Sequence, residues 1–535
     1  MMSESELPVI EMRPYRWGDP AKEARLPDAV AGALTALGAV PAPAPVPPED
    51  ATLPGSTLPA GARTALEAAV GTAHVSVDPL VRVAHTRGWS TPDLLRLRAG
   101  DAADAPDAVV FPGTAAEVAA VLGICAARHI AVVPFAGGTS VVGGLVAQRR
   151  GFAAVIALDV RRLDRLVALD EVSRTATLQA GMRGTAAEAL LNGRGYTLGH
   201  FPQSYEGAAV GGYAAARSAG QASAGYGRFD EMVVALTLVT PAGTVRLGTA
   251  PRSAAGPDLR ELVLGSEGAF GVVTDVTVRI RPRPQERIYD GWRFPDFATG
   301  AAALRRLAQD GPLPTVLRLS DEAETAVNLA DPGSAGTSPP AAGGCLAIAG
   351  YEGTGEDVRS RRARAGEVLA AGGGEDIGTD PGERWRAGRY SAPYLRDPLL
   401  DAGALVETLE TATFWSNLEP LKAAVTAALT DSLTSAGTPA LVLCHLSHVY
   451  ETGASLYFTV ACAQAGDPLA QWAAAKAAAS SAIRGTGGTI THHHGVGTDH
   501  RAIYHQEIGD LAVEALRAVK RTFDPEGICN PGVLI

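Results

Sequence analysis

The residues best suited to chemistry lie in three glycine-rich segments, each attached to a run of apolar residues. The first, Pro134-Phe-Ala-Gly-Gly-Thr-Ser140, follows a predicted buried strand. Because glycine lacks a Cβ atom, its backbone N–H groups can approach phosphate oxygens, and the Thr and Ser hydroxyls add further donors. The second segment spans 209–220 and the third spans 265–273. Each could be an ordinary turn, but together they could converge on one extended ligand.

A second group of reactive side chains lies near the C-terminus, in the run His492-His493-His494. If this run is a strand, alternate side chains point to opposite faces. His492 and His494 would then share a face and His493 would point away, so at least one imidazole would be structural. Tyr457 lies in the apolar run SLYFTV, which composition alone assigns to a core strand. A phenol near a histidine cluster would instead suit proton transfer.

Length and composition restrict the class of protein. With 535 residues, the chain is too long for one ordinary core, and two or three packed units are expected. Hydrophobic residues make up 46% and charged residues 19%, which excludes global disorder. The net charge of −11 argues against a nucleic-acid partner, since phosphate binding needs a basic surface. The five cysteines are widely spaced, as expected for reduced, mostly buried thiols.

The elements that must position these residues change in character along the chain. The sequence PAPAPVPP at 41–48 indicates a stiff connector behind an N-terminal arm that carries no secretory signal pattern. From about residue 107, short strands and helices alternate with glycine-rich turns. After 281–284, longer strands and helices predict an α+β sheet with helices on one face. The stretch 331–344 is expected to be a surface loop.

In their order and spacing, the three glycine-rich segments resemble the FAD-binding half of the vanillyl-alcohol-oxidase-type flavoproteins. The resemblance covers roughly residues 80–535. It implies an α+β fold with a two-subdomain PCMH-type FAD-binding domain, an α+β cap with an antiparallel sheet, and a helical N-terminal arm. The implied division is 1–100 for the arm and linker, 101–283 for the FAD domain, 284–488 for the cap, and 489–535 for a segment returning to the flavin.

This resemblance also implies which residues bind the cofactor. They are Pro134, Phe135, Ala136, Gly137, Gly138, Thr139, Ser140, Gln203, Ser204, Ala209, Gly211, Gly212, Ala216, Arg217, Ser218, Glu267, Gly268, Gly271, Val272 and Val273. Some members of the superfamily attach the flavin to a histidine in the first turn. Thr139 occupies that position here, so we expect FAD to be bound non-covalently.

Two families compete for the C-terminal half. FAD-dependent 2-hydroxyacid dehydrogenases, resembling D-lactate dehydrogenase or the glycolate oxidase subunit, hold a divalent metal with His and Glu residues of two motifs. At one of these positions the chain has Tyr457 in place of His, and at another it has His493 in place of Glu. These changes weaken a site for a hard metal, so we expect none. An FAD-linked oxidase or dehydrogenase of a 2-hydroxyacid or alcohol remains the alternative, and a flavoprotein without turnover is a third possibility.

The segments SHVYETGASLYF, THHHGVG and Tyr394-Leu-Arg396-Asp closely resemble the alkyldihydroxyacetonephosphate synthase family. That resemblance implies exchange of the acyl group of acyl-dihydroxyacetonephosphate for a fatty alcohol through an adduct at flavin N5, without net redox work. It implies Tyr457 as the general acid/base and His492, His493 and His494 as a proton relay. Arg396 would bind the substrate carboxylate or phosphate, with Arg318 in support.

The same resemblance implies the partners. We expect a lipid-like small-molecule substrate, a homodimer, and a cytoplasmic location compatible with peripheral contact at a membrane surface. Some departures leave room for a different substrate, because Ala136 replaces a third glycine, Gln203 replaces an acid and Ser455 replaces a cysteine.

Overall fold

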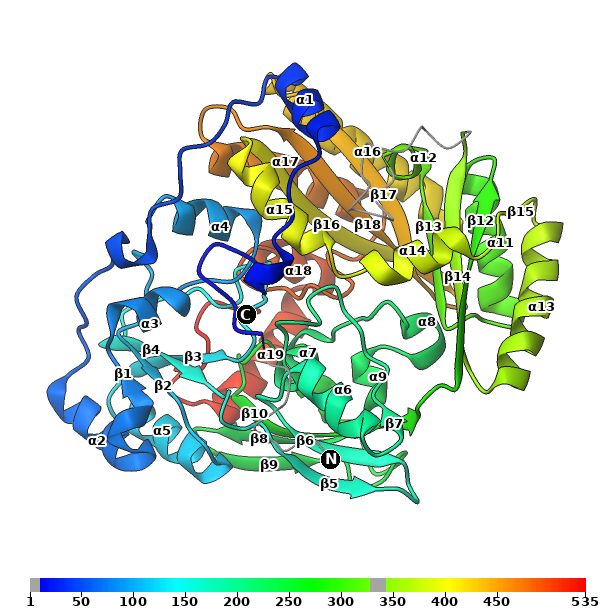
Figure 1. Ribbon diagram of the computed structural model, residues 1–535. Coiled ribbons are helices and arrows are strands. Elements are labelled where there is room, and N and C mark those ends of the chain that lie inside the picture. The colour runs from blue at the N-terminus through cyan, green and yellow to red at the C-terminus, as the bar shows by residue number, and fades with distance from the viewer. Residues whose placement is uncertain (1–9, 328–342) are drawn as a thin grey trace.

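The computed structural model describes residues 10–327 and 343–535. The strands of these residues form three larger sheets and one two-stranded pair (Figure 1). The loop expected at 331–344 lies almost entirely outside the described residues. Within them, no helix combines the length and apolarity needed to cross a bilayer.

The first sheet is small and mainly parallel, with the order β1-β2-β4-β3. Its strands are β1 (Val75–Ser76), β2 (Ala108–Val110), β3 (Ile130–Phe135) and β4 (Ala154–Asp159). Strands β2 and β4 are buried along their whole length, as short continuous apolar runs in a parallel sheet should be. Helix α5 (Ala115–Ala127) begins at the expected cap, where the Thr114 side chain accepts from the Glu117 N–H. Strand β3 leads directly into the first glycine-rich turn.

The second sheet is antiparallel, with the order β5-β6-β10-β8-β9. Its strands are β5 (Leu166–Asp170), β6 (Thr175–Gln179), β8 (Val233–Thr240), β9 (Gly243–Leu247) and β10 (Val272–Arg279). Buried and half-buried residues alternate along β10, because one face of the sheet packs on the interior. The third glycine-rich segment ends at the first residues of this strand.

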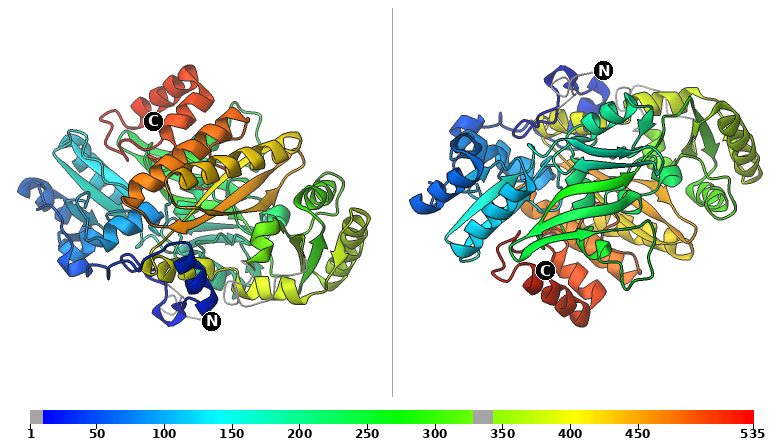
Figure 2. Two further views of the ribbon diagram at one scale, coloured as in Figure 1. Left: turned by 90° about the horizontal axis from the view of Figure 1, so that it is seen from above. Right: turned by 90° about the horizontal axis from the view of Figure 1, so that it is seen from below.

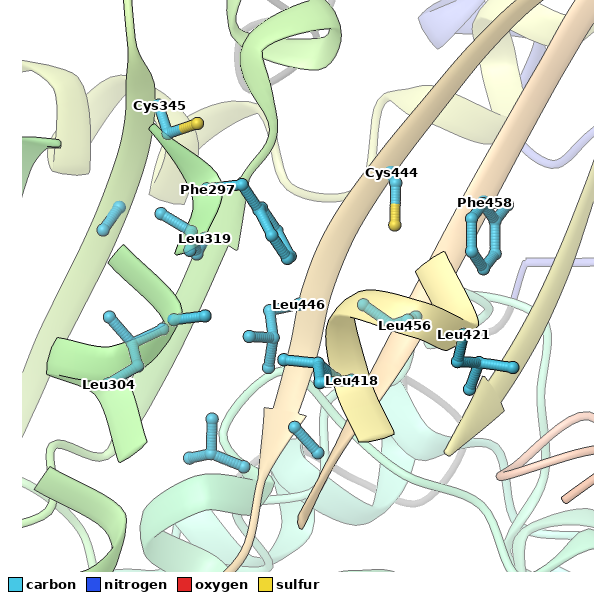
Figure 3. Close-up of a cluster of buried hydrophobic side chains, with 14 of the residues drawn as sticks. Phe297, Leu304, Leu319, Cys345, Leu418, Leu421, Cys444, Leu446, Leu456 and Phe458 are labelled. Carbon is cyan, nitrogen blue, oxygen red and sulfur yellow. The ribbon is translucent and has the colours of Figure 1, made fainter. Parts of the chain in front are cut away.

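The third sheet has seven strands in the order β15-β12-β14-β13-β17-β18-β16. They are β12 (Glu286–Phe294), β13 (Val316–Ser320), β14 (Cys345–Gly353), β15 (Glu375–Asp376), β16 (Ala404–Phe414), β17 (Leu441–Val449) and β18 (Gly453–Ala463). One face packs on α11 (Phe297–Asp310), α13 (Gly355–Ala371), α16 (Leu418–Ser435) and α17 (Pro468–Gly485). Figure 3 shows part of this core, where Leu456 and Phe458 of β18 point toward α16. Because side chains alternate, Tyr457 faces the opposite side.

The blue N-terminal arm and the red C-terminal helices lie on opposite sides of the molecule (Figure 2). The N-terminal arm carries α1 (Asp28–Ala36), and its Trp17 N–H donates to Asp397 at 2.8 Å. The last helices, α18 (Arg501–Ile508) and α19 (Asp510–Phe523), lead to Cys529, which pairs with β3 at Val132. The predicted α+β fold is therefore confirmed, whereas the exact domain boundaries stay predictions. All five cysteines are buried and unpaired, as expected.

Candidate active site

A cavity of about 450 Å³ lies between the glycine-rich segments and the open face of the seven-stranded sheet. Its walls come from β3, from helix α7 (Val210–Ala216), and from strands β13, β16, β17 and β18. Residues far apart in the sequence therefore share one enclosure. The topology, rather than any local motif, brings the predicted cofactor residues opposite the predicted catalytic residues.

All of the predicted cofactor residues except Arg217 line this cavity. Gly138 has a φ of +71°, a left-handed conformation that only glycine adopts readily, so the first turn depends on this residue. Gly212 lies within α7, and a Cβ atom added there would meet no heavy atom within 4 Å. Its bare surface is open to the cavity rather than filled by protein. These features fit a bulky phosphate-containing cofactor held against backbone, as FAD would require.

Replacing Gly212 with leucine should abolish FAD binding without unfolding the protein. The new side chain would enter the space that the glycine leaves open, and leucine favours a helix more than glycine does. We expect bound flavin per protein, measured by absorbance of the purified variant, to fall by about tenfold or more.

A matched control is Gly123→Leu in α5, where the glycine is exposed and a Cβ atom would again meet nothing within 4 Å. This variant should retain its flavin. Full flavin content in Gly212→Leu would show that the cofactor does not lie over this helix.

Arg217 is the one predicted cofactor residue that lies away from the cavity, and its role in cofactor binding stays a prediction. Arg217 is the left-handed residue at which α7 ends, with a φ of +51°. Its guanidinium pairs with Asp230 and Glu261 and does not line the cavity. Because α7 ends at Arg217, the side chain turns to these two carboxylates instead of to the cavity.

Glu267 connects the third glycine-rich segment to the C-terminal segment. Its Oε2 accepts the N–H groups of Val496 and Gly497, both at 2.8 Å. The Asn530 side chain donates to the carbonyl oxygens of Glu267 and Gly144, which ties the last residues to the same wall. Burial raises the pKa of Glu267 to about 7. The C-terminal segment is thus fixed against the cofactor wall.

Tyr457 stands at the centre of a group of aromatic rings on the cap side of the cavity. Its ring is stacked with those of His445 and His493, with 5.0 and 6.1 Å between ring centroids. The His494 ring meets it edge-on, with 5.7 Å between centroids. His445 lies directly opposite Tyr457 in the β17–β18 register. Burial raises the pKa of Tyr457 to about 12, so the phenol is protonated at neutral pH.

The histidine run adopts a different backbone from the one predicted. Residues 492–494 form a series of bends rather than a strand, and the N–H groups of all three histidines donate to the Glu410 carboxylate. The expected alternation is therefore wrong. His493 and His494 line the cavity, whereas His492 lies behind them with its Nε2 at 2.6 Å from the Tyr450 hydroxyl.

The buried imidazoles around Tyr457 are neutral. Burial lowers the pKa of His493 and takes that of His494 to about 3. Burial alone would raise the pKa of Glu410, but the adjacent histidines and the Thr491 hydroxyl hold it well below the usual value. The site therefore sets a protonated phenol beside neutral bases, with a buried carboxylate ready to stabilise an imidazolium.

The two predicted substrate arginines both line the cavity. Arg318 of β13 pairs with Glu324, which also contacts His445 Nδ1 at 2.8 Å. Although burial opposes its ionisation, His445 and Arg318 lower the pKa of Glu324 to about 2. Arg396 lies in α15 (Ala392–Asp401) and donates to the Trp89 carbonyl at 2.7 Å. The Nε atoms of both arginines are buried without a partner, so each keeps a donor for a ligand.

Three histidines behind Tyr457 come close enough to hold a metal ion. Ring nitrogens of His448, His492 and His493 lie within 4.8 Å of one another. The Nδ1 atoms of His492 and His493 are 3.0 Å apart, so a shared proton can also occupy this gap. The arrangement suits either a metal or a proton relay, and the prediction of no metal remains a prediction.

Sequence reasoning missed Glu410, His445 and Glu324, which hold the predicted residues in place. An acid within a strand is ordinarily read as solvated, so Glu410 gave no signal. His445 shares the face of Ser447 by simple alternation, and a bulge between Leu446 and His448 turns His448 to the cavity as well. That bulge cannot be read from the residue pattern.

Two family models cover most of the chain. A family described as "FAD binding domain" matches residues 106–248, and one described as "FAD linked oxidases, C-terminal domain" matches residues 283–534. Together with the cavity, these matches define an FAD-binding flavoprotein of the FAD-linked oxidase class.

Relatives place the chain more closely. The alkyldihydroxyacetonephosphate synthase of Dictyostelium discoideum is 33% identical over 478 residues, covering 86% of this chain and 78% of the relative. A solved alkyldihydroxyacetonephosphate synthase structure superposes with a TM-score of 0.84 at 27% identity, covering 97% of this chain and 98% of that one. A mitochondrial D-lactate dehydrogenase of Arabidopsis thaliana is 26% identical, covering 81% of this chain and 74% of the relative. The chain belongs to the alkyldihydroxyacetonephosphate synthase family.

Proposed function

We propose that the protein is an FAD-dependent transferase that exchanges the acyl group of acyl-dihydroxyacetonephosphate for a fatty alcohol. The observation that carries the proposal is the protonated Tyr457 phenol, stacked with His445 and with His493 in the lining of the predicted FAD cavity. Bound FAD would supply an electrophilic ring system, without net oxidation of the substrate. The absence of a covalent histidine at Thr139 supports non-covalent binding of FAD.

The residues of this chain would divide the proton transfers between them. Tyr457 starts protonated and donates, while neutral His493 and His494 accept. Once an imidazole holds the proton, the carboxylate of Glu410 stabilises its charge, since Nδ1 of His493 lies 3.7 Å from Glu410 Oε2. Arg318 and Glu324 fix His445 against the face of the phenol.

The lining of the cavity supports a lipid-like substrate. Beside Arg396 the wall is apolar, with Trp17 and Trp89 packed edge to face at 5.3 Å and with Leu399 and Val406 nearby. Burying long alkyl chains here would be favourable by about 0.8 kcal/mol per methylene. Because such substrates partition into bilayers, we extend the proposal to peripheral contact with a membrane surface. The homodimer and the cytoplasmic location rest on the family resemblance alone.

Label exchange tests this proposal. The purified holoenzyme, supplied with acyl-dihydroxyacetonephosphate and radiolabelled hexadecanol, should form labelled alkyl product, and a chelator should not reduce the rate. An exchange rate abolished by chelator and restored by a divalent metal would instead show that the cluster of His448, His492 and His493 binds a metal. A 2-hydroxyacid that reduces an electron-acceptor dye, with no labelled product from the lipid, would favour the dehydrogenase alternative.

A further inference from the structure

A third arginine, absent from the predicted set, also lines the cavity. Arg389 follows helix α14 (Asp380–Gly388), and its guanidinium lies 5.0 Å from the ring centroid of Phe201 and 4.9 Å from that of Tyr390. Its Nη1 is buried without a hydrogen-bond partner. Among the described residues, no carboxylate lies within ion-pair distance of it. A half-buried cation with a free donor in a cavity wall suits an anionic or strongly accepting ligand.

The backbone around Arg389 is held as a preformed site. Gln203 and Gln221 both donate from their Nε2 atoms to the Arg389 carbonyl, at 2.9 and 3.1 Å. The Oε1 of Gln221 is itself buried without a partner, and both glutamines line the cavity. Aromatic stacking and these bonds restrict the guanidinium before any ligand arrives, so less entropy is lost on binding.

The surroundings of Arg389 differ from those of Arg396. The Arg389 guanidinium lies against the rings of Phe201 and Tyr390, and the amide donors of the two glutamines are directed to its own carbonyl rather than to a ligand. Arg396 donates to Trp89 and lies next to the apolar part of the wall, with the buried Glu407 carboxylate on the same cavity lining. The two guanidinium groups, neither of them in an ion pair with a described residue, therefore lie in different parts of the cavity and can bind two anionic groups at once.

The proposed reaction, on which this inference rests, involves two such groups at once. The bond between the substrate carbon and the acyl oxygen breaks, and its electron pair leaves with the fatty carboxylate. The alcohol oxygen forms the new bond to that carbon, and its proton passes to a base. The phosphate monoester stays on the substrate throughout. A carboxylate attached to an alkyl chain and a compact phosphate must therefore be bound together.

We propose that Arg389, held in place by Gln203 and Gln221, binds the phosphate of the substrate, and that Arg396 binds the carboxylate of the departing acyl chain. The free Nη1 of Arg389 offers a charged N–H donor to a phosphate oxygen, and a guanidinium can present a second donor beside it. The apolar wall beside Arg396 accepts the chain that its carboxylate carries. Arg389 is thus a binding residue that fixes which end of the substrate enters which part of the cavity.

The test compares two product-like inhibitors on the intact holoenzyme. Dihydroxyacetone phosphate reports on the phosphate subsite, and palmitate reports on the carboxylate subsite. In Arg389→Gln, the inhibition constant for dihydroxyacetone phosphate should rise by about tenfold or more, while that for palmitate stays within about twofold. Arg396→Gln should show the reverse. Arg389→Lys, which keeps the charge but loses the fork, should fall between wild type and Arg389→Gln.

Flavin content separates the two sources of phosphate. If Arg389→Gln and Arg389→Lys lose FAD, the guanidinium serves the pyrophosphate of the cofactor and the proposal is overturned. Unchanged inhibition by dihydroxyacetone phosphate in a folded Arg389 variant also overturns the proposal for Arg389. In that case, label exchange by the wild-type enzyme would still support the proposed function. If the wild-type holoenzyme itself neither exchanges label nor responds to dihydroxyacetone phosphate, the proposed function and this inference fail together. Should Arg389→Gln not fold, Arg389→Lys gives the same comparison.

Discussion

Tyr457→Phe should lower the alkyl exchange rate by about 10²-fold or more while leaving FAD bound. The change removes one hydroxyl from a ring that remains stacked on His445 and His493. Its loss deletes the protonated donor and keeps the shape of the cavity. The measurements are the initial rate with radiolabelled alcohol and the visible absorbance of bound flavin in the same preparation.

Tyr351→Phe is the matched control for this substitution. Tyr351 lies in the same sheet, is fully buried, and has a hydroxyl without a hydrogen-bond partner. It belongs to the hydrophobic core on the helical face rather than to the cavity. This variant should exchange label at close to the wild-type rate. An active Tyr457→Phe enzyme would remove the phenol from the chemistry and leave His493 and His494 as the acid–base groups.

Glu410→Gln should lower kcat by roughly 10²-fold and move the acidic limb of the rate profile to lower pH. The ionised carboxylate accepts four hydrogen bonds from the histidine loop, one of them from Thr491. It also raises the pKa of His493 and His494, which burial lowers. An uncharged amide removes this opposing effect, so both imidazoles protonate only at still lower pH. The kcat measured from acidic to neutral pH gives the shift.

Two further variants separate loss of charge from loss of shape. Thr491→Val removes one hydrogen bond to Glu410 but keeps the carboxylate, so its pH profile should match wild type. Glu352→Gln changes another buried cap carboxyl, one that accepts from Tyr226 at 2.8 Å, and should leave the profile unchanged. A Glu410→Gln enzyme that slows without any shift in pH dependence would mean that the carboxylate only supports the loop.

Sequence reasoning performed best where a local pattern determines the structure. The glycine-rich segments require bare backbone whatever their surroundings, and all of their predicted contacts except Arg217 line the cavity. That inference rests on a steric rule that applies within a few residues. Tyr457 was identified only by family resemblance, since composition alone assigns its run to a core strand; in the structure, alternation along β18 turns it away from the core residues Leu456 and Phe458.

The residues that were missed or misjudged depend on contacts between distant segments. The histidine run bends because a carboxylate from β16, Glu410, gathers three successive N–H groups. No pattern within 491–497 reveals that partner, so strand alternation was the wrong rule for His493. Nor did the sequence give any indication of Arg389. This residue stands out only because its buried Nη1 has no hydrogen-bond partner and no carboxylate of the described residues lies beside it, which only the folded cavity shows.

The central claim is that acid–base chemistry in an FAD cavity exchanges an acyl for an alkyl group without net redox change. An anaerobic incubation with acyl-dihydroxyacetonephosphate and radiolabelled alcohol, followed by absorbance of the flavin and by product label together, tests it most directly. We predict many turnovers of labelled alkyl product, with the flavin fully oxidised at the end and no electron acceptor required. Stoichiometric bleaching of the flavin, with turnover only when an acceptor dye is added and no alkyl product, would contradict the account.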